Sequence, residues 1–403
     1  MLSTLVLVRP LFWRFIWTNL LFVFMSNPVT VQSLIVRISR LVRFVNEMFV
    51  MLKSYKYKLK PNKDQIVLLN KHFGSIRFAY NYFLNERKKE YETNKNTINY
   101  YDNAKSLTEL KKLEEYSWLN EINSQSLQDS LKNLETAYKN FFKFKKGFPR
   151  FKSKKSKNSF SVPQSVKLLN GKLVIPKFKE PIDLILSRSF SGIIKSCTIS
   201  KTPTNEYFVS ILVETEHTKL EKTGKSIGID LGLKDFVITS EGFKYKNNRY
   251  TKTYERKLKE HQQHLSRKTK GSNRYYKEKL KVANIYKKIT NSRLDNLHKV
   301  STELIKKYDV IVLEDLNIKG MVKNHKLSKH ISDASWSKFI ELLTYKAEWN
   351  DKEIVKIDRF FPSSKTCNCC GFINQNLKLD IREWTCPSCK TRLDRDLNAS
   401  INL

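Results

Sequence analysis

Hydrophobic and polar positions follow different periods along the chain, and the changes of period divide it into regions. Residues 53–59 (KSYKYKL) alternate with the period of two that is typical of a β-strand. From residue 63 to about residue 90 apolar side chains recur every three or four positions, which predicts a helix. Asn62 or Asp64 is the expected cap of this helix.

The middle of the chain changes from a helical pattern to a strand pattern. A second helical block is expected over residues 106–144, with Ser124 and Ser126 near a cap. Residues 159–216 then form short alternating runs separated by turns, which predicts an antiparallel barrel or sandwich. We expect the strand at 53–59 to join this sheet, with the helices inserted between.

A third region begins near residue 225 and mixes strands with helices. Residues 226–240 predict a β-hairpin followed by a turn at Glu241-Gly242, and residues 250–307 predict a long basic helical stretch. Further strands at 308–316 and 353–360 flank a helix near 335–350. Strands with intervening helices predict an α/β core.

Residues 1–50 differ from the remainder because they are rich in Leu, Val, Phe and Trp and contain no lysine. Their longest apolar run is interrupted and shorter than the ~20 residues of a membrane span. We interpret them as translated upstream sequence and expect a natural start at Met51 or Met48. A membrane anchor or a genuine accessory segment are the alternatives. A chain that begins at Met51 is expected to keep full activity.

Charge points to a polyanionic partner. The 403 residues include 75 Lys and Arg against 39 Asp and Glu, a formal charge of +36. Such an excess suits nucleic acid, because each neutralised phosphate releases condensed counterions. A ribosome-associated or merely soluble basic protein is the alternative. Residues 147–160 (GFPRFKSKKSKNSF) combine lysines with aromatic residues, which suits a nucleic-acid backbone or a solvated basic loop.

Five of the six cysteines cluster near the C-terminus, which predicts a metal site in a reducing compartment. Cys367, Cys370, Cys386 and Cys389 form the pattern C-x2-C-x15-C-x2-C, which is typical of structural zinc held by four thiolates. Cys369 is the spare thiol. A redox dithiol or unpaired cysteines are the alternative.

Three carboxylates stand out by position. Asp230 and Glu314 each close an apolar run, and Asp396 follows the cysteine cluster. A charge at the end of a buried strand is costly without a partner, and convergent carboxylates holding two Mg²⁺ ions would provide one. Each could instead cap a turn, and Asp315 and Asp394 compete with their neighbours for the role.

Several motifs, in this order, resemble the TnpB (OrfB) proteins of bacterial insertion sequences. They are MLKSYKYKLKPNKDQ, RFAYNYFLNE (77–86), GFPRFKSKK, GIDLGLKDFVITSEG, VIVLEDLNIKGM, the cysteine pairs and DRDLNASINL. The resemblance implies a mixed α/β multidomain fold with an RNase H-like (RuvC-type) nuclease domain at 223–364 and 392–403 and a zinc ribbon at 365–391. It also implies a β-barrel-like wedge domain at 51–61 and 146–222, with a helical recognition insertion at 62–145.

The resemblance further implies an RNA-guided DNA endonuclease in the bacterial cytoplasm, at the nucleoid. Its catalytic triad falls on Asp230, Glu314 and Asp396, which hold Mg²⁺, and its partners are DNA and a guide RNA from the element's own end. Relatives often continue beyond the third motif, so we expect the last helix to be weakly supported. A strand-transferring transposase and a non-catalytic, zinc-containing regulator of transposition are the competing hypotheses.

Overall fold

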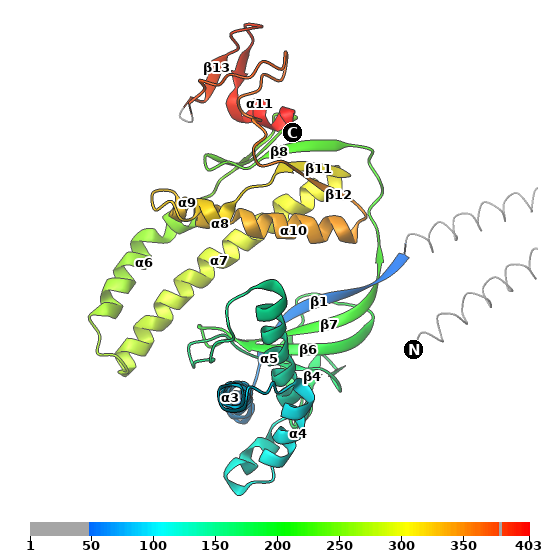
Figure 1. The fold of residues 1–403 in the computed structure, drawn as a ribbon, viewed down its shortest axis with the longest axis vertical. Coiled ribbons are helices and arrows are strands. Elements are labelled where there is room, and N and C mark those ends of the chain that lie inside the picture. The colour runs from blue at the N-terminus through cyan, green and yellow to red at the C-terminus, as the bar shows by residue number, and fades with distance from the viewer. Residues whose placement is uncertain (1–47, 379–380) are drawn as a thin grey trace, which may run out of the picture. The chain divides into compact units, whose positions relative to one another are not determined.

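A computed structural model describes residues 48–378 and 381–403 of the chain (Figure 1). The interpretation of residues 1–50 therefore concerns a segment that lies almost wholly outside the described residues. Within the described residues, no helix has the length and apolar character that crossing a bilayer requires.

The first strands form one seven-stranded sheet in the order β2-β6-β7-β1-β5-β4-β3. The prediction that the N-terminal strand joins the later ones is confirmed, because β1 lies between β7 and β5. Strands β1 to β7 belong to one sheet and not to the two sheets of a sandwich. The strands are β1 (Met48–Lys60), β2 (Asn158–Val162), β3 (Lys167–Leu169), β4 (Lys172–Val174), β5 (Ile182–Ile185), β6 (Ile193–Lys201) and β7 (Tyr207–Thr218).

Helices between β1 and β2 pack on this sheet and share its apolar core. Helix α3 (Lys63–Asn94) begins as predicted, because Asn62 Oδ1 accepts from Gln65 N at 2.8 Å and the Gln65 side chain accepts from Asn62 N at 3.0 Å. The predicted second block is instead three elements, since non-helical turns interrupt it. They are α4 (Tyr100–Leu110), the 3₁₀ helix η1 (Glu114–Glu121) and α5 (Ser124–Phe144), whose cap is Asn123.

A five-stranded sheet with the order β10-β9-β8-β11-β12 forms the second region. Strands β8 and β9 pair antiparallel, as do β9 and β10, whereas β11 runs parallel to both β8 and β12. The predicted hairpin and α/β arrangement are therefore confirmed. The strands are β8 (Ser226–Asp230), β9 (Asp235–Thr239), β10 (Lys244–Lys246), β11 (Val310–Glu314) and β12 (Glu353–Ile357).

Helices that follow β10 and β11 complete the second core. The predicted single helical stretch at 250–307 is two helices, because Gly271 adopts a φ of +92° and Ser272 caps a new helix. The helices are α6 (Tyr250–Ser266), α7 (Asn273–Lys307), α8 (Ile318–Met321), α9 (Ser328–Ala334) and α10 (Trp336–Trp349).

The C-terminal segment has a small core of its own, formed by Leu377, Trp384, Leu393 and two of the cysteines. It contains the paired strands β13 (Glu383–Thr385) and β14 (Arg392–Asp394) and leads directly into helix α11 (Arg395–Asn402). Helix α11 packs against β8 and β9. Contrary to expectation it is well supported, because Asn402 Nδ2 donates to the carbonyls of Ser363 and Thr366 at 2.8 and 2.7 Å.

Candidate functional site

The parallel pairing of β8 with β11 brings two carboxylates to the same edge of the five-stranded sheet. Leu313 lies opposite Ile229 in this pairing, so Glu314 and Asp230 follow at neighbouring strand ends. The buried Ile229 and Leu313 hold the two strands in the apolar core, and each chain then reaches a partly buried carboxylate. This is the juxtaposition that the strand-end pattern predicted.

Helix α11 brings the third carboxylate to the same place. Asp396 lies in its first turn, and the helix passes directly over Gly228 on β8. A Cβ atom at Gly228 would lie 2.1 Å from the Ser400 carbonyl oxygen, so only glycine permits this approach. The sequence therefore supplies the carboxylate on α11 and, at Gly228, the space that lets α11 lie against β8.

The three carboxylates interact electrostatically. Burial, followed by the negative charges of Glu314 and Asp396, raises the pKa of Asp230 to about 7. Arg395 opposes this rise but does not cancel it. A carboxyl with this pKa marks a place where negative charge accumulates, which is the environment that a cation would stabilise.

Each competing acidic residue has a different role. Asp315 is about half exposed and pairs with Arg359 at 2.6 Å. Asp394 caps α11, accepting from the backbone of Asp396 and Leu397 at 3.0 Å, and also pairs with Lys244 at 2.8 Å. These contacts account for Asp315 as a surface ion pair and Asp394 as a helix cap.

Three polar residues around the carboxylates were not predicted. Ser363 donates through its hydroxyl to Glu314, and Arg382 donates from one nitrogen to both carboxylate oxygens of Asp396, at 3.0 and 2.8 Å. Asn398 is buried and donates to the Thr366 carbonyl at 2.7 Å. Ser363 lies in a loop and Arg382 in the cysteine segment, where no periodicity or spacing signals them, whereas Asn398 lies on α11 within the DRDLNASINL motif.

The four predicted zinc ligands lie together. Their sulfur atoms are all within 4.8 Å of one another, and the Sγ atoms of Cys367 and Cys389 are 3.6 Å apart, as are those of Cys370 and Cys386. A hydrogen bond with the Thr391 hydroxyl lowers the pKa of Cys389 to about 6, whereas burial raises the pKa of Cys367 to about 12, so a bound cation would be needed to hold Cys367 as a thiolate. Cys369 is exposed and outside this group.

Known proteins with similar sequences match nearly the whole described chain. A protein of Streptomyces pristinaespiralis named "Putative RNA-guided DNA endonuclease" is 38% identical over 355 residues, covering 87% of this chain and 88% of that protein. The chain belongs to the TnpB (OrfB) family. A second relative, "Putative RNA-guided DNA endonuclease InsQ" of Escherichia coli, is 30% identical over 370 residues, covering 87% and 91% of the two chains.

Family profiles match this TnpB-family chain in three stretches. "Probable transposase" matches residues 210–325, "Cas12f1-like, TNB domain" matches 336–403, and "Helix-turn-helix domain" matches 48–96, which here form β1 and α3. Among solved structures, a chain of a Cas12f1-sgRNA-target DNA complex has 13% identity and a TM-score of 0.48, covering 88% of this chain and 98% of that one.

Aromatic and basic residues at the C-terminal end of α5 and just beyond it are exposed in this TnpB-family chain. The side chains of Phe142 and Phe144 are 69% and 68% exposed, and Phe148 packs edge-on against Tyr138 and Phe141. Lysines surround them, and Lys146 lies over the Phe144 ring. Flat apolar rings among positive charges are suited to stacking on nucleic-acid bases.

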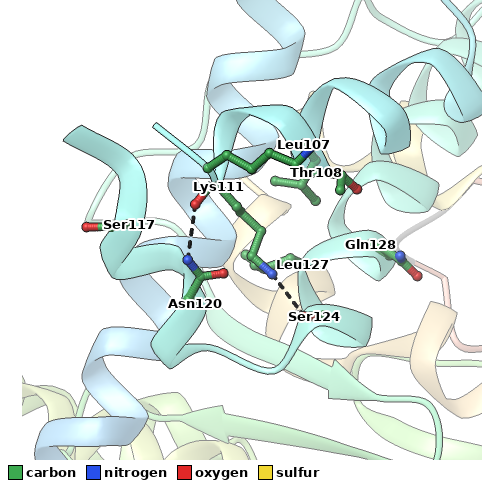
Figure 2. A pocket seen from close by; sticks show the side chains of 9 residues that line it. Leu107, Thr108, Lys111, Ser117, Asn120, Ser124, Leu127 and Gln128 are labelled. Atoms are coloured by element: carbon green, nitrogen blue, oxygen red, sulfur yellow. Dashed lines mark hydrogen bonds between the residues drawn. The ribbon is translucent and has the colours of Figure 1, made fainter. Parts of the chain in front are cut away.

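A cavity of about 730 Å³ lies elsewhere, between α4, η1 and α5 (Figure 2). Lys111 crosses it and donates to Ser124 Oγ at 3.0 Å, while Asn120 Nδ2 donates to the Lys111 carbonyl at 3.1 Å. None of the predicted site residues lines it.

Proposed function

We propose that this chain is a transposon-encoded, RNA-guided DNA endonuclease that hydrolyses phosphodiester bonds with Mg²⁺ held by Asp230, Glu314 and Asp396. The convergence of these carboxylates from β8, β11 and α11 is the observation that carries the proposal. The relatives named as RNA-guided DNA endonucleases support the same activity.

The topology of the five-stranded sheet supports an RNase H-like, RuvC-type nuclease domain. Three antiparallel strands are followed by two parallel ones, and the carboxylates come from the first strand, the fourth strand and the terminal helix. The nuclease domain would comprise residues 223–364 and 392–403, with the zinc ribbon inserted at 365–391.

The donor set fits magnesium. Mg²⁺ prefers carboxylate oxygens, and the pKa of Asp230 is raised first by burial and then by the charges of Glu314 and Asp396, both of which a divalent cation would offset. Bound Mg²⁺ supplies an activated water and stabilises the leaving oxygen. In this chain, the strands fix Asp230 and Glu314, Ser363 orients Glu314 through a hydrogen bond, and Asp394 fixes the first turn of the helix that carries Asp396.

The remaining regions would bind nucleic acid. The sheet at 51–61 and 146–222 and the helices at 62–145 share one core, so we assign them together to guide RNA and target DNA as wedge and recognition domains. The exposed Phe142 and Phe144 would stack on bases. The formal charge of +36 supports a partner of high negative charge.

The test is cleavage by the full chain purified with its co-expressed RNA. Asp230→Asn should lower the rate of target cleavage by roughly 1,000-fold or more, because metal ligands contribute several kcal/mol to the transition state, and should leave RNA binding intact. Asp315→Asn is the matched control, since it removes an acid of the exposed pair with Arg359 and should cleave normally.

Two outcomes would contradict the proposal. Cleavage by Asp230→Asn at the normal rate would refute the site. Joining of element ends by the protein without RNA would favour a strand-transferring transposase instead.

A further inference from the structure

Helices α6 and α7 lie side by side as a hairpin (Figure 1). Helix α6 has no buried side chain along its whole length. Tyr254, Leu258 and Leu265 are partly buried at helical spacing on α6, and polar contacts add to its attachment to α7. One of them is the hydrogen bond from Gln262 Nε2 to the Tyr286 hydroxyl at 3.2 Å.

Near the tip, three potential metal ligands converge from the two helices. His261 and His264 lie one turn apart on α6, and Glu278 lies in the second turn of α7. Their ligand atoms are all within 4.8 Å of one another. Glu278 Oε1 lies 2.6 Å from His261 Nδ1 and 3.9 Å from His264 Nδ1.

The chemistry of this group goes beyond that of a surface ion pair. Glu278 is 6% exposed, so its carboxylate is fixed and largely removed from water. Its second oxygen contacts Lys281 Nζ at 3.1 Å, which leaves Oε1 facing both imidazoles. One carboxylate oxygen and two imidazole nitrogens are a donor set that suits borderline divalent ions and leaves a position for water.

We propose that His261, His264 and Glu278 form a second metal site, which binds Zn²⁺, Co²⁺ or Ni²⁺ and fastens the α6–α7 hairpin. The site is separate from the four cysteines, which use thiolates, and from the three carboxylates, which suit Mg²⁺. Binding requires the His261–Glu278 contact to open slightly, because two atoms that share a metal at about 2.1 Å each lie about 3 Å apart or more. The exposed position of His264 allows this adjustment.

Occupancy would suppress opening of the hairpin. A ligand that binds only the closed form reduces the open fraction by the factor 1 + [L]/Kd, so metal at about 100 times its Kd slows amide exchange through that opening about 100-fold. The effect should be confined to α6 and the first turns of α7, where the ligands lie.

The experiment uses the full chain carrying zinc on its cysteines, titrated with Co²⁺. One further equivalent should bind, with visible absorption but without the sulfur-to-metal bands that a cysteine site would give. Hydrogen exchange should slow in α6. His264→Ala should lose this equivalent while it keeps the cysteine-bound zinc and its helical content, because that imidazole is 48% exposed and its contacts, at 3.9 Å to Glu278 and edge-on to the His261 ring, are weak.

Two further variants complete the test. His330→Ala removes an exposed histidine on α9 and should keep both metals. Lys281→Ala should bind Co²⁺ a few-fold more tightly, because it removes a positive charge from Glu278. No second equivalent in the unaltered chain, or one that survives His264→Ala, would show that the cluster is only a histidine–carboxylate hydrogen bond.

Discussion

Gly228 controls how closely α11 approaches the five-stranded sheet. It lies two positions before Asp230, so both side-chain positions face the same side of β8. With no Cβ at Gly228, the backbone of α11 rests directly on the strand at Ser400. The distance between Asp230 and the residues of α11 therefore depends on the absence of a Cβ atom at Gly228.

Gly228→Ala should disable cleavage without altering any carboxylate. The added Cβ would meet the Ser400 carbonyl oxygen at 2.1 Å, so the helix must move away. A displacement of this kind should lower the cleavage rate roughly 100-fold. The free energy of unfolding should fall by about 1–3 kcal/mol. Rates measured at saturating Mg²⁺ on a folded, RNA-loaded chain check this.

Gly74→Ala is the matched control, because a Cβ there meets nothing within 4 Å and α3 gains a better helix former. It should cleave normally and be slightly more stable. Normal cleavage by Gly228→Ala would show that the position of α11 does not matter.

The site could be predicted from the sequence only in part. The positions of Asp230 and Glu314 at neighbouring strand ends could be expected, because each acid closes an apolar run, although the pattern alone left a turn-capping role open. The sequence pattern could not decide between Glu314 and Asp315. Consecutive residues point to opposite faces, and only the packing of β12 and Arg359 decides which face is solvated. Arg382 could not be found at all, since its contact with Asp396 depends on how the cysteine segment folds.

At the scale of elements, the cysteine segment supports α11. Asn398 on α11 accepts from the Asn368 backbone N at 2.9 Å, within the first cysteine pair, and donates to the Thr366 carbonyl. Strand β14 runs directly into the helix. The fold of the cysteine segment should therefore affect the position of Asp396.

Cys370→Ser should lose zinc and most of the cleavage activity even with excess Mg²⁺, because the segment that positions α11 loses its metal. Cys369→Ser is the control, since this exposed thiol lies outside the cluster and should leave both zinc content and cleavage unchanged. Elemental analysis and cleavage assays check the pair. Zinc retained by Cys370→Ser and lost by Cys369→Ser would mean that the wrong cysteine was assigned.

The aromatic residues at the end of α5 give a second test at this scale. Replacing Phe142 and Phe144 by Ala should weaken binding of the guide RNA by about 1–3 kcal/mol for each base that stacks. Stability should barely change, because both rings are mostly exposed. Tyr101→Ala, which removes a 79% exposed ring from α4, should bind RNA normally. Equal loss in both variants would point to a nonspecific effect of removing rings.

Element boundaries were harder to predict than element types. The period of the apolar residues identified α3 and α7, whose buried stripes are long. It missed the break between α6 and α7, because α6 has no fully buried side chain and its partly buried apolar positions, Tyr254, Leu258 and Leu265, give only a weak pattern. Only Gly271 and Ser272 mark that boundary, through a positive φ and a helix cap.

At the scale of the whole molecule, Glu206 links elements of the two large cores. It pairs with Lys58 on β1 at 2.6 Å and with Lys287 on α7 at 2.5 Å, while Thr204 donates to it at 2.7 Å. Hydrogen bonds from Lys287 and then Lys58 lower the pKa of Glu206 to about 2, from 4.5. The carboxylate is thus stabilised in the folded chain relative to the unfolded one.

This shift predicts a stability that depends on pH in the acidic range. A lowered carboxyl pKa contributes stability that is fully present above pH 4.5 and is lost as the pH falls toward 2. Glu206→Gln should therefore be less stable than the unaltered chain by about 1 kcal/mol at pH 6, after allowance for screening by solvent. The difference should shrink as the pH is lowered from 4.5, as measured by urea unfolding.

Glu121→Gln removes the exposed pair with Lys71 and should show a much smaller difference at pH 6. A Glu206→Gln deficit that stayed constant down to pH 3 would mean that packing of the side chain, and not its charge, links the two cores.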